Sequence, residues 1–170
     1  MPDTTTKRQP IVDRPAIPAE YGVKRAKEYV DWSHVEGRLE ASRVYWVATS
    51  GPGGKPHVRP IDGLYVDGVI YVGGSPGTRW VRDLFENRQV AIHLDGVDDV
   101  VIVEGEAELM QGADAELAQR LADASNTKFP EYGMTPDNYR TGPGPFAIRP
   151  RKVVAWTDFT SNPTRFRFQG

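Results

Sequence analysis

Residues 43–72 read RVYWVATSGPGGKPHVRPIDGLYVDGVIYV, and this stretch decides the fold class. β-Branched and aromatic residues dominate it, with turn residues at short intervals, which is typical of antiparallel strands. Gly51-Pro52-Gly53-Gly54 is expected to reverse the chain once, and Asp67-Gly68 is a strong signal for a two-residue hairpin. The pattern predicts a meander of four strands at residues 43–49, 56–63, 64–66 and 69–72.

The rest of the chain adds more strands and a few short helices. Ser33 and Glu36 have the spacing of a capping box at the start of a helix. We predict helices at residues 34–41, 78–87 and 113–125, a loop at 126–141, and strands at 89–94, 100–109, 146–149, 152–159 and 164–168. Six to eight short strands with inserted helices indicate a mainly β fold, a β-barrel, because a doubly wound sheet would need a helix after nearly every strand.

The length of 170 residues suits one domain. Residues 1–19 contain four prolines and little apolar periodicity, so we expect a disordered N-terminal arm there. The folded domain is expected to cover residues 20–170.

Composition excludes several classes of function. The net charge of −2 lacks the broad basic surface expected of a protein that binds nucleic acid or an acidic membrane. The absence of cysteine excludes disulfides, thiolate metal sites and cysteine nucleophiles. No run of about 18 apolar residues and no signal-peptide core is present, so we expect a cytoplasmic protein.

The segment 73–80, GGSPGTRW, leaves a strand, passes through glycines and opens a helix. The free N–H groups of that helix start, the hydroxyls of Ser75 and Thr78, and the Arg79 guanidinium could together bind a phosphate beside Gly74. The alternative is a glycine-rich connection that Thr78 caps, with Arg79 in solvent. Trp80 lies inside the proposed phosphate site or, as is commoner for tryptophan, in the core.

A second candidate cluster lies on the strand that follows the first turn. Strand alternation puts His57, Arg59 and Ile61 on one face, where an anionic ligand could lie across the sheet. Pro60 removes one ladder donor, which indicates a sheet edge or a bulge. The alternative is an exposed strand face with solvated charges.

The C-terminal segment alternates two arginines with two phenylalanines. Arg165 and Arg167 share one face, and Phe166 and Phe168 share the other, so we expect an edge strand docked on this subunit or on a partner. Stacking on single-stranded nucleic acid is a weaker alternative for this pattern.

Hydrolytic machinery is not visible in the sequence. No serine sits in a nucleophile elbow, no phosphate-binding Walker loop is present, and His34, His57 and His93 have no metal-ligand spacing. If the chain is an enzyme, a cofactor supplies the reactivity.

At this point the sequence resembles the pyridoxamine 5′-phosphate oxidase-like, flavin-binding split-barrel family. The resemblance is carried in order by YWVAT (45–49), GKPHVRPI (54–61), DGVIYV (67–72), TRWVRDLFENRQVAIHL (78–94) and VIVEGEA (101–107). The ending PTRFRF (163–168) is similar to that of an actinobacterial branch that includes deazaflavin-dependent members.

The resemblance implies a split-barrel homodimer with cofactor sites at the subunit interface. It implies that the strand of Arg59, Pro60 and Ile61 lies along a flavin ring. The residues that it implies for the cofactor site, together with the candidates above, are His57, Arg59, Pro60, Ile61, Gly74, Ser75, Thr78, Arg79, Trp80, Arg165 and Arg167.

The expected cofactor is FMN, with the deazaflavin coenzyme F-420 as the alternative, because Trp80 stands where many relatives carry a lysine. The implied activity is hydride transfer between the cofactor and a small organic substrate, with no catalytic side chain assigned. The alternative is a non-catalytic split-barrel protein that binds heme, another tetrapyrrole or the cofactor.

Overall fold

The Asp67-Gly68 hairpin is present as predicted in the computed structural model, which describes residues 9–23, 28–141 and 143–169. It joins β3 (Pro56–Val66) to β4 (Val69–Val72), and both turn residues have positive φ angles, 52° for Asp67 and 78° for Gly68. These angles fit the type I′ turn that matches the twist of the two strands.

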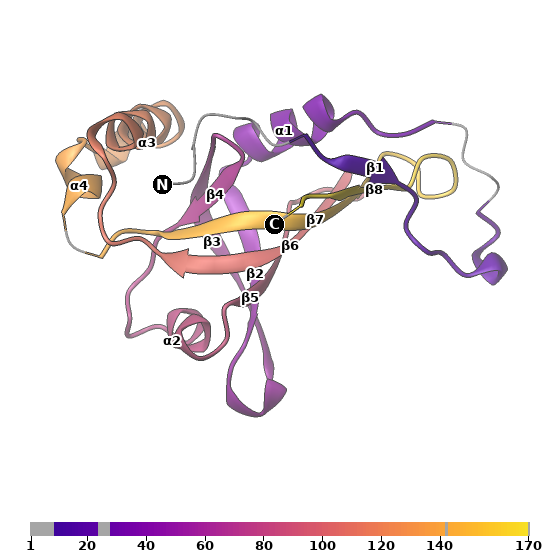
Figure 1. The fold of residues 1–170 in the computed structure, drawn as a ribbon, viewed down its shortest axis with the longest axis horizontal. Helices are drawn as coiled ribbons and strands as arrows, with labels where there is room; N and C mark the ends of the chain where they lie inside the picture. The colour runs from indigo at the N-terminus through magenta and orange to yellow at the C-terminus, as the bar shows by residue number, and fades with distance from the viewer. Residues whose placement is uncertain (1–8, 24–27, 142, 170) are drawn as a thin grey trace.

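Six antiparallel strands close a barrel within the described residues (Figure 1). They follow one another in the order β7–β4–β3–β2–β5–β6, and β6 pairs back onto β7. The remaining strands of the barrel are β2 (Val44–Ser50), β5 (Gln89–His93), β6 (Val100–Leu109) and β7 (Phe146–Trp156). The predicted mainly β barrel is therefore confirmed.

Two further strands extend the sheet beyond the barrel. β7 is long enough to pair with β4 through residues 146–148 and with β8 (Thr164–Arg167) through residues 152–155. β1 (Ile11–Asp13) then adds to the free edge of β8. The expected arm over residues 1–19 thus contains a strand at Ile11–Asp13, and its first eight residues lie outside the described residues.

The main core fills the barrel. Alternate residues of β2 and β6 point inward, as in Tyr45, Val47 and Val103, all at most 1% exposed. α1 (Trp32–Ala41) adds Val35 and Leu39 to this core, and α2 (Arg79–Glu86) packs on β2 and β3.

A second core lies outside the barrel wall. α3 (Ala115–Lys128) covers the outer face of β3, β4 and β7, and α4 (Asp137–Arg140) packs against α3 (Figure 1). Leu121 of α3 is fully buried there. The predicted loop at 126–141 is therefore partly wrong, since α3 continues to Lys128 and α4 follows it.

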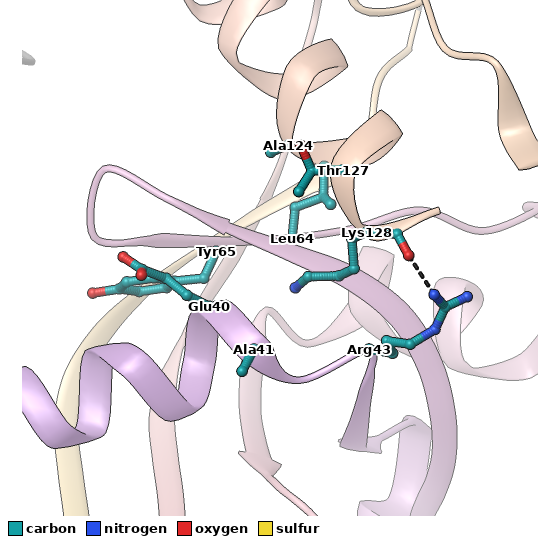
Figure 2. A pocket seen from close by; sticks show the side chains of 8 residues that line it. All are labelled: Glu40, Ala41, Arg43, Leu64, Tyr65, Ala124, Thr127 and Lys128. Atoms are coloured by element: carbon teal, nitrogen blue, oxygen red, sulfur yellow. Dashed lines mark hydrogen bonds between the residues drawn. The ribbon is translucent and has the colours of Figure 1, made fainter. Parts of the chain in front are cut away.

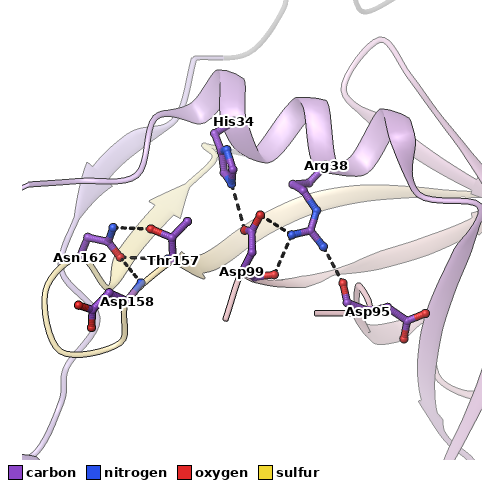
Figure 3. Close-up of polar contacts among 7 residues, drawn as sticks. All are labelled: His34, Arg38, Asp95, Asp99, Thr157, Asp158 and Asn162. Carbon is purple, nitrogen blue, oxygen red and sulfur yellow. Dashed lines mark hydrogen bonds and ion pairs between the residues drawn. The ribbon is translucent and has the colours of Figure 1, made fainter. Parts of the chain in front are cut away.

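Polar contacts tie α1 to the turn between β5 and β6 (Figure 3). His34 Nε2 lies 3.0 Å from Asp99 Oδ1, and the Arg38 guanidinium donates to the backbone oxygens of Asp95 and Asp99. These contacts hold α1 across one end of the barrel. Figure 3 also shows the loop after β7, where Asn162 Oδ1 accepts from the backbone N–H of residue 157.

Three predictions about local structure differ from the observed elements. The capping box is wrong, because α1 begins at Trp32 with Asp31 as its N-cap, and Glu36 is instead buried with Tyr65 Oη 3.3 Å away. The meander has three strands, since residues 56–66 form one strand, and residues 146–156 likewise form one.

No helix in the described part of the chain is long and apolar enough to cross a membrane.

Candidate functional site

The first half of β3 is an open edge of the barrel. β2 pairs with residues 56–62, whereas β4 pairs only with residues 63–66. Across from β2, residues 56–62 have no neighbouring strand in the part of the chain that the structure describes. Pro60 lies in this segment, where its missing N–H can face the open side without loss of a ladder hydrogen bond. The prediction that Pro60 marks an edge is confirmed.

The inward side of this edge carries the second predicted cluster. Arg59 pairs with Val47, and Ile61 pairs with Tyr45, and both partners are fully buried. Because directly paired residues share a face, the side chains of His57, Arg59 and Ile61 belong to the inner face. Ile61 packs against the main core, while Arg59 is exposed where the barrel opens.

The segment between β4 and α2 presents an uncapped helix start. The Thr78 hydroxyl donates to the Ser75 carbonyl oxygen at 2.7 Å, and no side chain caps α2. Ser75 Oγ accepts from the backbone N–H of Gly77 at 3.2 Å, which shapes the turn. The first-turn N–H groups of α2 therefore keep their partial positive charge available for an anion.

Trp80 is a core residue. It is only 4% exposed, and its ring centroid lies 6.0 Å from that of Phe146. Gly74 lies against the indole so closely that a Cβ there would be 2.1 Å from Trp80 Cζ2. The indole therefore supports the turn from beneath, and in this chain it is not a surface on which a ligand could stack.

Arg79 joins the two predicted clusters. Its guanidinium donates to the Lys55 carbonyl oxygen at 3.3 Å, just before β3 begins. Burial lowers the pKa of His57, and the nearby charges of Arg79 and Arg59 lower it further. His57, Arg59 and Arg79 thus lie within electrostatic reach of one another, and the neutral imidazole leaves the two guanidiniums as the cationic groups.

The side chain of Arg59 makes no hydrogen bond or ion pair with any other residue in the described ranges. An exposed guanidinium beside an uncapped helix start is a suitable arrangement for a phosphate, because both groups offer N–H donors and positive charge. We refer to Arg59, Arg79 and the 74–78 turn as the phosphate cradle.

Sequence reasoning missed Asp83. This carboxylate is buried, accepts from Thr49 Oγ1 at 3.0 Å, and lies 3.7 Å from Arg79 Nε. Gly51 leaves room for it, since a Cβ at that position would lie 2.3 Å from Asp83 Oδ1. The spacing of Arg79 and Asp83, four residues apart on a helix, was the available signal.

Arg165 and Arg167 lie elsewhere in the chain. β8 pairs with β7 and β1, and β7 and β4 separate it from β3 in the sheet. Asp13 of β1 holds both arginines, with oxygens 2.6 Å from Arg165 Nε and 2.8 Å from Arg167 Nη2. The hydrogen bonds from Arg165 lower the pKa of Asp13. Within one chain these arginines do not join the phosphate cradle.

The described residues form no candidate metal-binding site. Over residues 9–23, 28–141 and 143–169, no three His, Asp or Glu side chains are grouped so that they could hold a metal ion.

Comparison with known proteins decides the family. The family profile described as pyridoxamine 5′-phosphate oxidase matches residues 32–156, which is most of the chain. The chain belongs to this family. No curated protein matches the chain.

Several solved structures share the fold. An FAD-binding protein from Mesorhizobium loti is 18% identical with a TM-score of 0.57, covering 94% of this chain and 99% of its own. An F420 reductase is 19% identical with a TM-score of 0.52, covering 69% and 94%. The heme storage protein HutZ from Vibrio cholerae is 17% identical with a TM-score of 0.58, covering 74% and 94%. At these identities the likeness establishes the fold alone.

Proposed function

We propose that this chain is a cytoplasmic, homodimeric oxidoreductase that transfers a hydride between a flavin-type cofactor and a small organic substrate. FMN is the first candidate for the cofactor, and the deazaflavin coenzyme F-420 is the alternative. The observation that carries the proposal is the phosphate cradle: Arg59, whose side chain is unpaired among the described residues, and Arg79, at the uncapped start of α2, both act on the charge of His57.

The residues present fit the phosphate of such a cofactor. Arg59 and Arg79 supply charge, and the turn at 74–78 supplies N–H and hydroxyl groups. Asp83 limits where Arg79 can point, because it lies 3.7 Å from the Nε atom. Each charge-assisted hydrogen bond of this kind contributes about 1.5–3 kcal/mol.

The open edge of β3 fits the polar rim of a flat ring. The backbone groups of residues 56–62 that face away from β2 have no strand partner, and Ile61 adds an apolar contact. The cofactor, when bound, supplies the hydride chemistry, and the protein orients the ring and excludes water. We assign no acid or base to a side chain.

The homodimer is supported by an uncovered outer face. α3 covers the outside of β3, β4 and β7, but the outer side chains of β2, β5 and β6 stay half-buried or exposed. Direct pairing places one row of side chains across this face, in the order Pro60, Trp46, His93, Ile102, Val154, Arg165 and Asp13.

A two-fold axis near the middle of this row would make the phosphate cradle a shared site. Such an axis exchanges the two ends of the row, since each copy presents the same patch. Arg165 and its neighbour Arg167 of one protomer would then lie over the β3 edge of the other. This arrangement reconciles their distance from Arg59 within one chain with the expected role of these arginines in cofactor binding.

The test is titration of the apoprotein with FMN and with coenzyme F-420, followed by absorption and fluorescence. We expect Arg59→Ala and Arg79→Ala each to weaken binding of the preferred cofactor at least tenfold, or about 1.4 kcal/mol. Arg140→Ala is the control, because it removes the same charge from an exposed position on α4. Unchanged affinity in both cradle variants would contradict the assigned site.

Heme binding without turnover is the second candidate, favoured by the structural likeness to HutZ. Titration with hemin distinguishes the two. A Soret band that saturates at one heme per chain, with no binding of either flavin-type cofactor, would replace the oxidoreductase proposal.

A further inference from the structure

A pocket of about 480 Å³ lies away from the phosphate cradle, between the end of α1, the second half of β3 and the end of α3 (Figure 2). Its volume is in the range of small-molecule sites. It is lined by Glu40, Ala41, Arg43, Leu64, Tyr65, Ala124, Thr127 and Lys128. None of these residues belongs to the phosphate cradle.

Lys128 is the one amine in this lining. Figure 2 shows its side chain reaching from α3 into the space between Glu40, Ala41 and Leu64. The Nζ atom donates to Ser42 O at 2.7 Å and to Gly63 O at 3.2 Å. These two hydrogen bonds fix the position of the nitrogen within the pocket.

The third contact of Lys128 Nζ is weak. Tyr45 Oη lies 3.5 Å away, at the outer limit of a hydrogen bond, and the ring centroid of Tyr45 lies 5.4 Å away. The phenol hydrogen of Tyr45 is donated to Leu39 O instead. The nitrogen can therefore release one proton with little loss of hydrogen bonding.

One of the two cations in the lining is already paired. Arg43 pairs with Glu131 at 3.0 Å and donates to the Lys128 carbonyl oxygen, so it is not available to a ligand anion. Glu40 is the carboxylate of the lining, and Tyr65 adds a phenol. With Arg43 engaged and a carboxylate in the lining, a neutral carbonyl compound suits the pocket better than an acid.

The surroundings also weaken the proton affinity of this amine. Burial, followed by the charge of Arg43, lowers the pKa of Lys128 to about 8, and Glu40 opposes the shift. A larger fraction of the amine is therefore neutral and nucleophilic near pH 7.5 than in an exposed lysine.

We propose that this pocket is a second ligand site, in which Lys128 captures small neutral aldehydes reversibly as an imine. The Nζ lone pair forms a C–N bond to the carbonyl carbon. The carbonyl oxygen then leaves as water with the two hydrogens of the neutral amine, and no oxidant or reductant is needed. Ala41, Leu64 and Ala124 offer apolar walls to the alkyl part of the aldehyde.

The test uses the native protein, propanal and sodium cyanoborohydride at pH 7.5, with peptide mapping by mass spectrometry. Lys55 is the internal control because it is exposed and lies outside the pocket. We expect Lys128 to be alkylated at least ten times faster than Lys55. Equal or slower labelling of Lys128 would overturn the proposal.

A second aldehyde separates the pocket from amine reactivity alone. Oxidised dextran, a polymeric aldehyde, is far larger than a pocket of about 480 Å³, so Lys128 should lose its preference over Lys55. If Lys128 keeps the same preference with both aldehydes, the pocket is not the site. Lys128→Arg keeps the positive charge and can keep the carbonyl contacts, and its total labelling with propanal should fall to the level of the remaining amines.

Discussion

The Thr78 hydroxyl donates to the Ser75 carbonyl oxygen instead of accepting from the first turn of α2. The sequence was compatible with a capped, closed helix start and with an open one. The rotamer of this single side chain favours the open form, because a capping oxygen would occupy the N–H groups that a phosphate needs. At the residue scale, the phosphate cradle therefore depends on the rotamer of Thr78.

Gly74 gives a prediction at this scale. A Cβ at residue 74 would lie 2.1 Å from Trp80 Cζ2, and the buried indole cannot move aside easily. We expect Gly74→Ala to lower the free energy of unfolding by about 1–3 kcal/mol, the usual range for overpacking. The measurement is chemical denaturation followed by tryptophan fluorescence.

Gly73→Ala is the matched control, since a Cβ at residue 73 would meet no atom within 4 Å. We expect a change within about 0.5 kcal/mol. Equal effects at the two glycines would show that the indole contact does not determine the shape of the turn.

At the scale of elements, β3 has two different halves. Residues 63–66 have a strand on both sides, whereas residues 56–62 have one neighbour. Turn chemistry located the Asp67-Gly68 hairpin from sequence, and Pro60 indicated the edge. The sequence could not show that β3 runs unbroken through Gly63, because that glycine resembles a turn residue.

The reason for Gly63 lies in packing. A Cβ there would be 2.8 Å from Tyr45 Cδ2 and 3.0 Å from Tyr71 O. Glycine therefore allows close approach within a strand and does not break it. The same limit explains the misassigned Glu36, since burial against Tyr65 outweighed the local motif.

β1 gives a prediction at the element scale. This strand has three residues, and Asp13 is paired with both Arg165 and Arg167. In Asp13→Asn, we expect faster amide hydrogen exchange in Ile11–Asp13 with little change in global stability, because ion pairs that solvent still reaches contribute little. Asp137→Asn is the control, since its carboxylate pairs with Arg140 far from β1.

Acid should have the same effect as the Asp13 substitution. The pKa of Asp13 lies below its ordinary value of 3.8, so the stabilisation of β1 is complete above about pH 4. It is lost as the pH falls through the folded-state pKa. If acidification does not accelerate amide exchange in β1 relative to amide exchange in β8, this role of Asp13 is contradicted.

At the scale of the whole molecule, the two sides of the barrel wall differ. α3 buries the outer face of β3 and β4, whereas Trp46, His93 and Ile102 remain half-buried or exposed on the other outer face. Trp46 and His93 are stacked, with an interplanar angle of 1° and centroids 5.9 Å apart. A partly exposed surface that includes Trp46 and Ile102 suits contact with a second copy of the same surface.

The proposed dimer predicts a clear effect of Ile102→Arg. Near a two-fold axis a substituted residue lies close to its own copy, so two like charges would be buried together. We expect a monomer in sedimentation velocity, together with loss of cofactor affinity. Val97→Arg is the control, because Val97 is 91% exposed in the turn between β5 and β6.

A wild-type protein that sediments as a monomer would contradict the dimer itself. A dimer that survives Ile102→Arg would show that another surface forms the interface.

The sequence by itself determined the barrel class, the hairpin and the edge at Pro60, and it pointed to the two segments that we propose as the phosphate cradle. These features follow from local chemistry: strand periodicity, turn residues, and a missing N–H. Only the tertiary structure decided that Trp80 is buried, that Asp83 accepts a hydrogen bond from Thr49, and that Asp13 holds Arg165 and Arg167. Those outcomes depend on which residues meet when the sheet forms, and spacing along the chain carries no signal of such distant contacts.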